Sequence, residues 1–274
     1  MSAPADDRGS TGPAVGQARD WIACGRQLVL RQPSLWYGMA GVYIVLAFLL
    51  TLIPFMGHLL LILITPMLLA GVIWGRAHPA PAEPEPAPPA SPGQALLQTW
   101  VTQPTQELLR IFSQEGRLFG AVLLGIVTLG LVMAVKIVGY LLIGGSMISG
   151  LAAGQSAGTQ LTALFGIVLV AILSVLLGMA LLYSVPLTVL GNRQPLDAVA
   201  ESFTTCRTHA RTLLILVAPF FLVYVAIVAA FANYPWLGTL LLISVGLLAL
   251  PLFIAAVYCS YLALFPPTPS KPRQ

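Results

Sequence analysis

One amine lies inside an apolar run, where its position could support chemistry. Lys136 is the only charged residue between Leu118 and Ile143. A charge within a membrane-length helix is costly and usually marks a contact with a ligand, an ion or a lipid. Lys136 precedes Ile143 by about seven residues, or roughly 10 Å of helix, which a lysine side chain can span. Two interpretations stay open: an amine that reaches the membrane–water interface, and a contact to an anionic ligand or lipid headgroup.

A second basic group lies between two later apolar runs. It consists of Arg193, Arg207 and Arg211, with His209 beside them. Basic clusters at a membrane surface bind phosphate headgroups, and they also orient a protein without binding a particular lipid. We therefore predict these three arginines, together with Lys136, as candidate contacts for anionic lipid or another anionic ligand.

The cysteines and carboxylates form no pattern typical of catalysis or metal binding. Cys24, Cys206 and Cys259 lack a paired spacing such as C-x-x-C, and the three histidines are scattered. A soft-metal site built from these cysteines and His209 is conceivable, but isolated cysteines in helices usually pack as small apolar groups. All nine acidic residues lie outside the apolar runs, so no acid–base constellation forms. We predict no catalytic residue, no metal, no cofactor, no disulfide framework and no enzymatic activity.

The elements that position these residues are apolar runs of membrane-spanning length. The chain of 274 residues is 58% hydrophobic and 8% charged, whereas a soluble domain carries roughly 25% charged residues. About 20 apolar residues cross the hydrocarbon core as a helix. The runs that meet this length are Leu35–Ile53, His58–Gly75, Leu118–Ile143, Leu161–Leu190, Thr212–Ala232 and Leu237–Phe265. The sequence predicts an all-α polytopic membrane bundle with about six transmembrane helices and additional amphipathic interfacial helices.

The charges lie on one side of these runs. Apart from Lys136, every charged residue falls before the first run, between the second and third, between the fourth and fifth, or after the sixth. The positive-inside rule then places both termini in the cytoplasm. This orientation accounts for the net charge of +4, and we expect no nucleic-acid partner.

Each predicted hairpin follows a segment with helical apolar periodicity. The three apolar stripes are Val15, Ala18, Trp21, Gly25 and Leu28; Leu97, Trp100, Val101, Leu108, Ile111 and Phe112; and Leu196, Val199, Ala200 and Phe203. Gly71 and Gly75 have the spacing for close helix packing inside the chain. Pro186 and Pro251 are expected to kink their helices without ending them.

These features divide the chain into five segments. They are a cytoplasmic tail with an interfacial helix (1–34), a first hairpin (35–75), a Pro-rich cytoplasmic linker (76–95), a membrane domain (96–265) with hairpins at 118–190 and 212–265, and a cytoplasmic tail (266–274).

A group of turn and small residues carries a resemblance. The segment from Val185-Pro186-Leu187 to Asp197-Ala198, then Ser202-Phe203 and Cys206, with Arg31-Gln32-Pro33 before the first run, resembles an uncharacterised family of bacterial inner-membrane proteins. The chain is more loosely similar to the YciC-like group and to the membrane domains found beside glycerophosphodiester phosphodiesterases. The resemblance implies six helices in the bacterial inner membrane and implies no activity.

These observations favour an integral inner-membrane protein with a non-enzymatic accessory, scaffold or assembly role. Its expected partners are the lipid bilayer, anionic lipids, and another membrane protein or a second copy of the chain. The alternative is a transporter of a small molecule or lipid, which the kinking prolines and Lys136 would suit. A polar cavity that reaches the bilayer midplane would distinguish the alternative.

Overall fold

The computed structural model describes residues 13–54, 56–78, 91–145 and 157–266, and all regular structure in these ranges is helical. Six spans are long and apolar enough to cross a membrane: Pro33–Thr51, Met56–Ala77, Gly116–Gly144, Gln160–Val189, Ala210–Phe231 and Pro235–Leu264. Each begins and ends within two residues of its predicted bounds. The predicted all-α polytopic architecture is confirmed.

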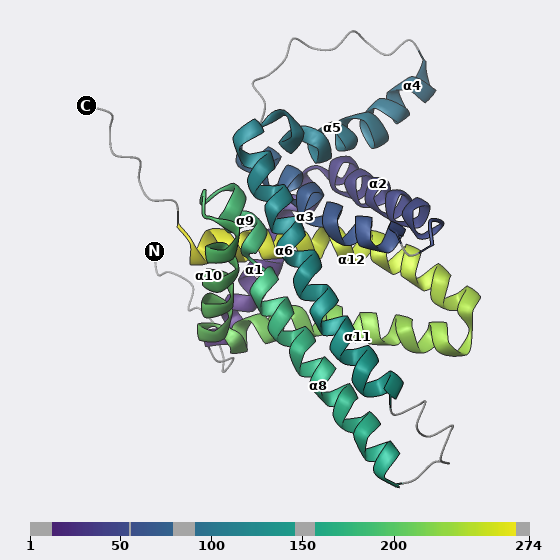
Figure 1. The fold of residues 1–274 in the computed structure, drawn as a ribbon. Coiled ribbons are helices and arrows are strands. Elements are labelled where there is room, and N and C mark those ends of the chain that lie inside the picture. The colour runs from purple at the N-terminus through teal and green to yellow at the C-terminus, as the bar shows by residue number, and fades with distance from the viewer. Residues whose placement is uncertain (1–12, 55, 79–90, 146–156, 267–274) are drawn as a thin grey trace, which may run out of the picture. The chain divides into compact units, whose positions relative to one another are not determined.

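The helices are labelled in chain order in Figure 1. The long ones are α2 (Pro33–Thr51), α3 (Met56–Ala77), α6 (Glu115–Gly139) with its π-helical extension η3 (Tyr140–Gly144), α8 (Ala157–Leu181), α11 (Ala210–Asn233) and α12 (Pro235–Leu264). The others are α1 (Pro13–Arg31), α4 (Pro92–Leu97), η1 (Gln98–Thr102), α5 (Gln103–Leu109), η2 (Arg110–Ser113), α9 (Ser184–Val189) and α10 (Pro195–Thr208). Most of the predicted Pro-rich linker, at 79–90, lies outside the described residues, as do the loop at 146–156 and most of both predicted tails.

The chain forms two compact units. The terminal unit comprises Met1–Val45, Pro88–Thr105 and Thr208–Gln274, and the central unit comprises Leu46–Ala87 and Gln106–Arg207. Both units draw on segments that are distant in the sequence. Helix α2 contributes residues to each of them.

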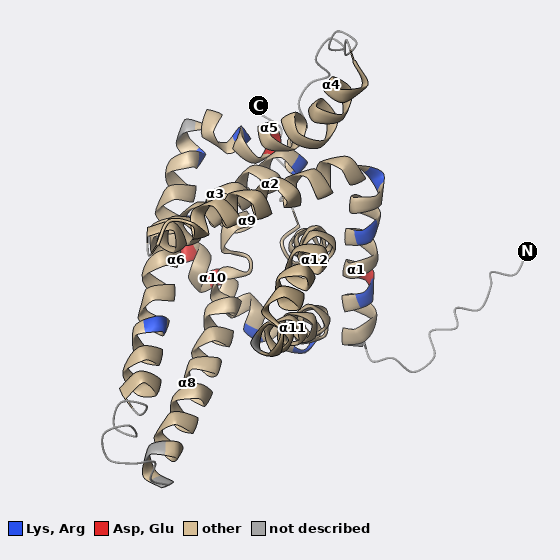
Figure 2. Ribbon diagram, turned by 90° about the vertical axis from the view of Figure 1, so that its right-hand side faces the viewer, with Lys and Arg blue, Asp and Glu red and all other residues tan. Residues whose placement is uncertain are grey.

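In the terminal unit, α1 packs across α12 (Figures 1 and 2) and also contacts α11. Its buried residues are Ala18, Trp21, Gly25 and Val29, which recur every three or four positions and therefore share one helix face. Most of the apolar stripe predicted for this segment is confirmed, although the stripe ends at Val29. A Cβ atom at Gly25 would lie only 2.6 Å from the amide nitrogen of Ala256. Glycine is therefore needed where α1 meets α12.

Glycines also set the packing of the central unit, in which α3 contacts α6, α9 and η2. A Cβ atom at Gly71 would lie 2.1 Å from the carbonyl oxygen of Leu108, and one at Gly75 would lie 2.1 Å from a carboxylate oxygen of Glu107. The prediction that this glycine pair packs inside the chain is confirmed. Helix α6 continues the packing to α8, which runs beside it.

The fourth span is interrupted before Pro186. Helix α8 ends at Leu181, and α9 begins only after Leu182 and Tyr183. Proline lacks an N–H group and its ring crowds the carbonyl four residues earlier, which places the break there. The span continues through Pro186 to Val189 as predicted, but the helix is interrupted at Leu182 and Tyr183. At Pro251 the helix does continue, because α12 extends past it to Leu264.

A side chain of α10 satisfies the backbone at this break. The buried hydroxyl of Ser202 accepts a hydrogen bond from the Tyr183 N–H at 3.0 Å and donates one to the Met179 carbonyl oxygen at 2.8 Å. A buried backbone group without a partner costs about as much as a lost hydrogen bond. Ser202 therefore stabilises the interruption that Pro186 causes.

Helix α10 packs on the protein with a face other than its predicted apolar stripe. Its buried residues are Pro195, Ala198, Ser202 and Cys206. In the stripe, Leu196 and Ala200 are exposed and Val199 and Phe203 are only half-buried, so the stripe is not what packs against the protein. Small residues allow close helix approach, whereas large apolar side chains are stable towards lipid.

The predicted stripe between the second and third spans is divided. In the terminal unit, Leu97, Trp100 and Val101 are exposed. In the central unit, Leu108 and Ile111 are buried where η2 packs against α3. Within the second half of the stripe, Leu108 and Ile111 therefore pack inside the central unit, whereas Phe112 is exposed.

Replacing Gly25 should weaken the attachment of α1. In Gly25→Leu the new side chain would overlap the α12 backbone at Ala256, and overpacking typically costs about 1–3 kcal/mol. We expect the apparent melting temperature in mild detergent to fall by roughly 3–10 °C. Gly16→Leu is the matched control, because a Cβ atom at this α1 position meets nothing within 4 Å. Equal melting temperatures for the two variants would contradict the packing described.

Removing the Ser202 hydroxyl should destabilise the central unit. Ser202→Ala removes this partner from the buried Tyr183 N–H and from the partly buried Met179 carbonyl, at a cost of about 1–3 kcal/mol. Thr204→Ala is the control on the same helix, because the exposed Thr204 hydroxyl bonds only within α10, to Ala200. Thermal unfolding in detergent should separate the two variants. A loss of stability in Thr204→Ala as large as in Ser202→Ala would rule out a specific role for the buried hydroxyl.

Candidate functional site

Lys136 meets a histidine from another helix of the central unit. Lys136 lies in the last turn of α6, and its ammonium nitrogen is within hydrogen-bond distance of Nε2 of His58, in the first turn of α3. The two helices pack against each other. Lysine has donors only, so Nε2 accepts and the other ring nitrogen can carry the imidazole proton. The pair therefore presents a cation and several N–H donors from two helices.

A groove lies beside Lys136. It has a volume of about 520 Å³ and runs between α6–η3 and α8. Its lining is largely apolar and includes Val132, Val135, Gly139, Val170 and Leu177, with Ser174, Tyr140 and Lys136 as its polar members. Gly139 opens the groove, because a Cβ atom there would lie 3.3 Å from a methyl group of Val170.

The sequence alone does not identify His58 as the partner of Lys136. The feature of the sequence that points to this contact is the antiparallel order of the second and third spans, which places the start of one beside the end of the other. Lys136 lies before the end of its span, however, and α6 with η3 continues about eight residues, or roughly 12 Å, beyond it. The relative register of α3 and α6 depends on where their side chains pack, which spacing alone does not show.

The predicted arginines do not form one cluster in the central unit. Arg193 precedes α10 and Arg207 lies in its last turn, so about 20 Å of helix separates them. The Arg193 guanidinium pairs with the carboxylate of Glu201 at 3.4 Å, and both groups are partly exposed. Arg211 belongs to the terminal unit, where it is exposed near the start of α11. Each remains a candidate contact for anionic headgroups on its own.

A basic and aromatic stack holds the charged ends of α3 and α6 together. The Arg117 guanidinium lies 4.2 Å from the ring centre of Trp74. The Trp74 ring stacks on the His78 ring, with the two ring centres 3.7 Å apart. Arg117 also donates to the carbonyl oxygen of Val189 at the end of α9. Arginine over an aromatic face is stabilised by cation–π attraction. The stack joins three helices of the central unit, and we assign it a structural role.

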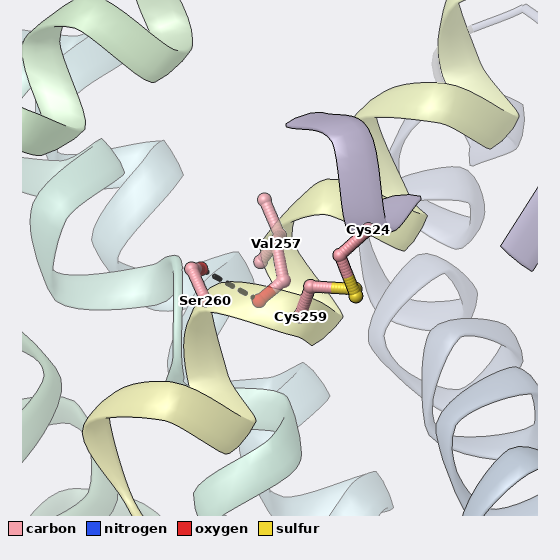
Figure 3. The surroundings of a disulfide bond; sticks show 4 residues. All are labelled: Cys24, Val257, Cys259 and Ser260. Carbon is pink, nitrogen blue, oxygen red and sulfur yellow. Dashed lines mark hydrogen bonds between the residues drawn. A yellow bond between two sulfur atoms is a disulfide. The ribbon is translucent and has the colours of Figure 1, made fainter. Parts of the chain in front are cut away.

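Cys24 and Cys259 form a disulfide in the terminal unit (Figure 3), with their Cα atoms 6.2 Å apart. Cys24 lies on α1 one position before Gly25, and Cys259 is buried on α12. The expectation of no disulfide is wrong. The two residues are 235 positions apart, and only the packing of α1 against α12 brings them together.

Cys206 is a buried free thiol on α10. Burial raises the pKa of Cys206 to about 11, and its hydrogen bond with Ser202 offsets only part of that increase. The thiolate is the form that attacks electrophiles and binds metals, so Cys206 is unreactive near neutral pH. In the described ranges, no three His, Cys, Asp or Glu side chains are grouped to hold a metal ion.

The disulfide predicts how a cut chain behaves. With a protease site inserted at 79–90, the cleaved protein should run as one species on a non-reducing gel and as two fragments after reduction, because Cys24 and Cys259 lie on different fragments. Cys24→Ser should give two fragments in both conditions. Cys206→Ser is the matched control and should behave like the parent chain. Two fragments from the parent under non-reducing conditions, with cells lysed into an alkylating agent, would contradict the bond.

No protein-family model, curated protein or solved structure matches this chain. Its candidate sites are therefore known by their geometry: the Lys136–His58 pair on an apolar groove, the separate arginines of α10 and α11, and the disulfide that joins α1 to α12.

Proposed function

We propose that this chain is a multi-pass protein of the bacterial inner membrane, with both termini in the cytoplasm and a non-enzymatic accessory, scaffold or assembly role. Six apolar helices of spanning length support the membrane location. Confinement of the charges to alternate loops supports the orientation. The resemblance of the segment around Pro186 to bacterial inner-membrane proteins supports the compartment.

The observation that carries the assembly role is the exposure of α8. Only 6% of the most apolar stretch of this span is buried within the chain, compared with 44% for the span formed by α3. Neither α8 nor α12 carries a charged residue (Figure 2). Helices in a bilayer associate through van der Waals contacts, because lipid is as apolar as leucine. A long uncharged helix with one main neighbour has a face free for a helix of another membrane protein.

The exposed face of α8 points away from α6. Its large exposed side chains include Leu164, Val168, Ile172 and Val175. By the helical period these residues lie opposite the groove-lining Val170. A partner helix could therefore pack on α8 without displacing α6.

In-cell photo-crosslinking tests the assembly role. A photo-reactive phenylalanine at Leu164 or Val168 should give discrete protein adducts, because both side chains are exposed on the proposed face. The same residue at Leu124 is the control and should give none, since Leu124 is buried on α6. An adduct of twice the chain mass identifies a second copy as the partner, and another discrete mass identifies a different protein. Adducts to lipid alone at Leu164 and Val168 would overturn the proposal.

Transport of a small molecule or lipid is the second candidate function. The broken fourth span favours it, because interrupted helices line the binding sites of many transporters. Here, however, the Ser202 hydroxyl accepts a hydrogen bond from the Tyr183 N–H at the interruption, and Tyr183 is buried within the protein. The groove beside Lys136 is largely apolar. The geometry therefore gives transport less support than assembly.

A further inference from the structure

We propose that the groove between α6 and α8 binds an anionic phospholipid, with the phosphate on the Lys136–His58 pair and one acyl chain along the groove. The inference rests on the membrane location that belongs to the proposed function. It does not require the assembly role, so the crosslinking experiment and the lipid experiment can fail separately.

The charge of Lys136 has no negative counterpart within the spans. Lys136 is the only charged residue in the interior of the six spans, because Arg76, Arg117 and Arg211 each lie one residue from a span end. All nine acidic residues of the chain lie outside the spans. Its observed contact is His58, which supplies an acceptor nitrogen and no negative charge. A cation in an apolar environment needs a counter-charge. A lipid phosphate is the anion available at this depth, because it arrives attached to the bilayer itself.

The Lys136–His58 pair offers several hydrogen-bond donors to one ligand. An ammonium group has three N–H donors, and His58 uses one of them. Two remain, together with an N–H on the second ring nitrogen of the histidine. A phosphodiester offers several acceptor oxygens at one centre, so it can accept from both side chains at once. A quaternary ammonium headgroup adds a positive charge and no acceptor, which should lower affinity.

The groove between α6 and α8 has the size and chemistry of a lipid-binding site. Its volume of about 520 Å³ falls in the range of roughly 300–1,000 Å³ that ligand sites occupy. Lys136 lines the groove, and the other lining residues continue along both helices from Val132 to Gly144 and from Val170 to Leu177. An elongated apolar groove with one cation fits an acyl chain with an anionic head. A free phosphate ion would leave the apolar walls unused.

Native mass spectrometry of the full chain in neutral detergent tests the proposal. The probes are phosphatidylglycerol and phosphatidylcholine with identical acyl chains. We expect the parent protein to bind phosphatidylglycerol about fivefold more tightly than phosphatidylcholine. One basic side chain beside an anionic headgroup gives a preference of this size. Lys136→Gln should lose this preference and Lys136→Arg should keep it. Equal binding of phosphatidylglycerol by the parent and by Lys136→Gln would overturn the proposal.

A groove variant tests the acyl chain independently of charge. Ser174→Phe fills the groove from α8 while Lys136 remains, and it should weaken binding of both lipids by about fivefold or more. Ile172→Phe is the matched control, because Ile172 is exposed on the opposite face of α8, and it should bind like the parent. Unchanged binding in Ser174→Phe, with melting temperature equal to the parent, would place the lipid elsewhere.

A soluble headgroup separates a phospholipid from a free phosphate. Glycerophosphoglycerol carries the same phosphodiester without acyl chains. At millimolar concentration it should leave bound phosphatidylglycerol in place, since the groove contributes most of the contact. Full displacement by the headgroup alone would show an anion site without an acyl-chain groove and would contradict the proposal.

Discussion

Both units of this protein depend on close backbone approach between helices, at positions where a side chain would not fit. In a soluble protein the hydrophobic effect drives apolar helix surfaces together. Lipid is as apolar as those surfaces and provides no such force, so packing contacts have to hold membrane helices together. Gly25 brings α1 onto α12, and Gly71 brings α3 onto the segment that contains Leu108. The same constraint explains α10, where Ala198 and Ser202 face the protein and the larger Leu196 does not.

The backbone imposes a second constraint, which the fourth span illustrates. Pro186 removes a donor and crowds a carbonyl, so the helix opens at Leu182 and Tyr183. Unpaired amides are costly away from water, and Ser202 supplies the partner from a helix that follows in the chain. The serine and the proline are thus one structural device, although 16 positions separate them.

The sequence predicted what each segment is and missed what each segment touches. The six membrane spans were predictable from composition, because the hydrocarbon core tolerates few charges over about 20 residues. The buried stripe on α1 was predictable because charged residues mark the opposite face of that helix. On α10, lipid and protein both accept apolar groups, so hydrophobicity could not separate the face that packs on the protein from the face that is exposed. His58 beside Lys136 and Cys24 beside Cys259 depend on helix register and on neighbours far along the chain. No local pattern encodes either.

The joining of α1 to α12 has a consequence for biosynthesis. A ribosome makes α1 first and reaches Cys259 only 235 residues after Cys24. At roughly 5–20 residues per second, that interval is on the order of ten to fifty seconds. During it, the face of α1 that carries Trp21 has no partner on α12, and the membrane surface is the nearest apolar phase that can receive it. Helix α1 is therefore translated long before α12 and is among the last helices to reach its final neighbours.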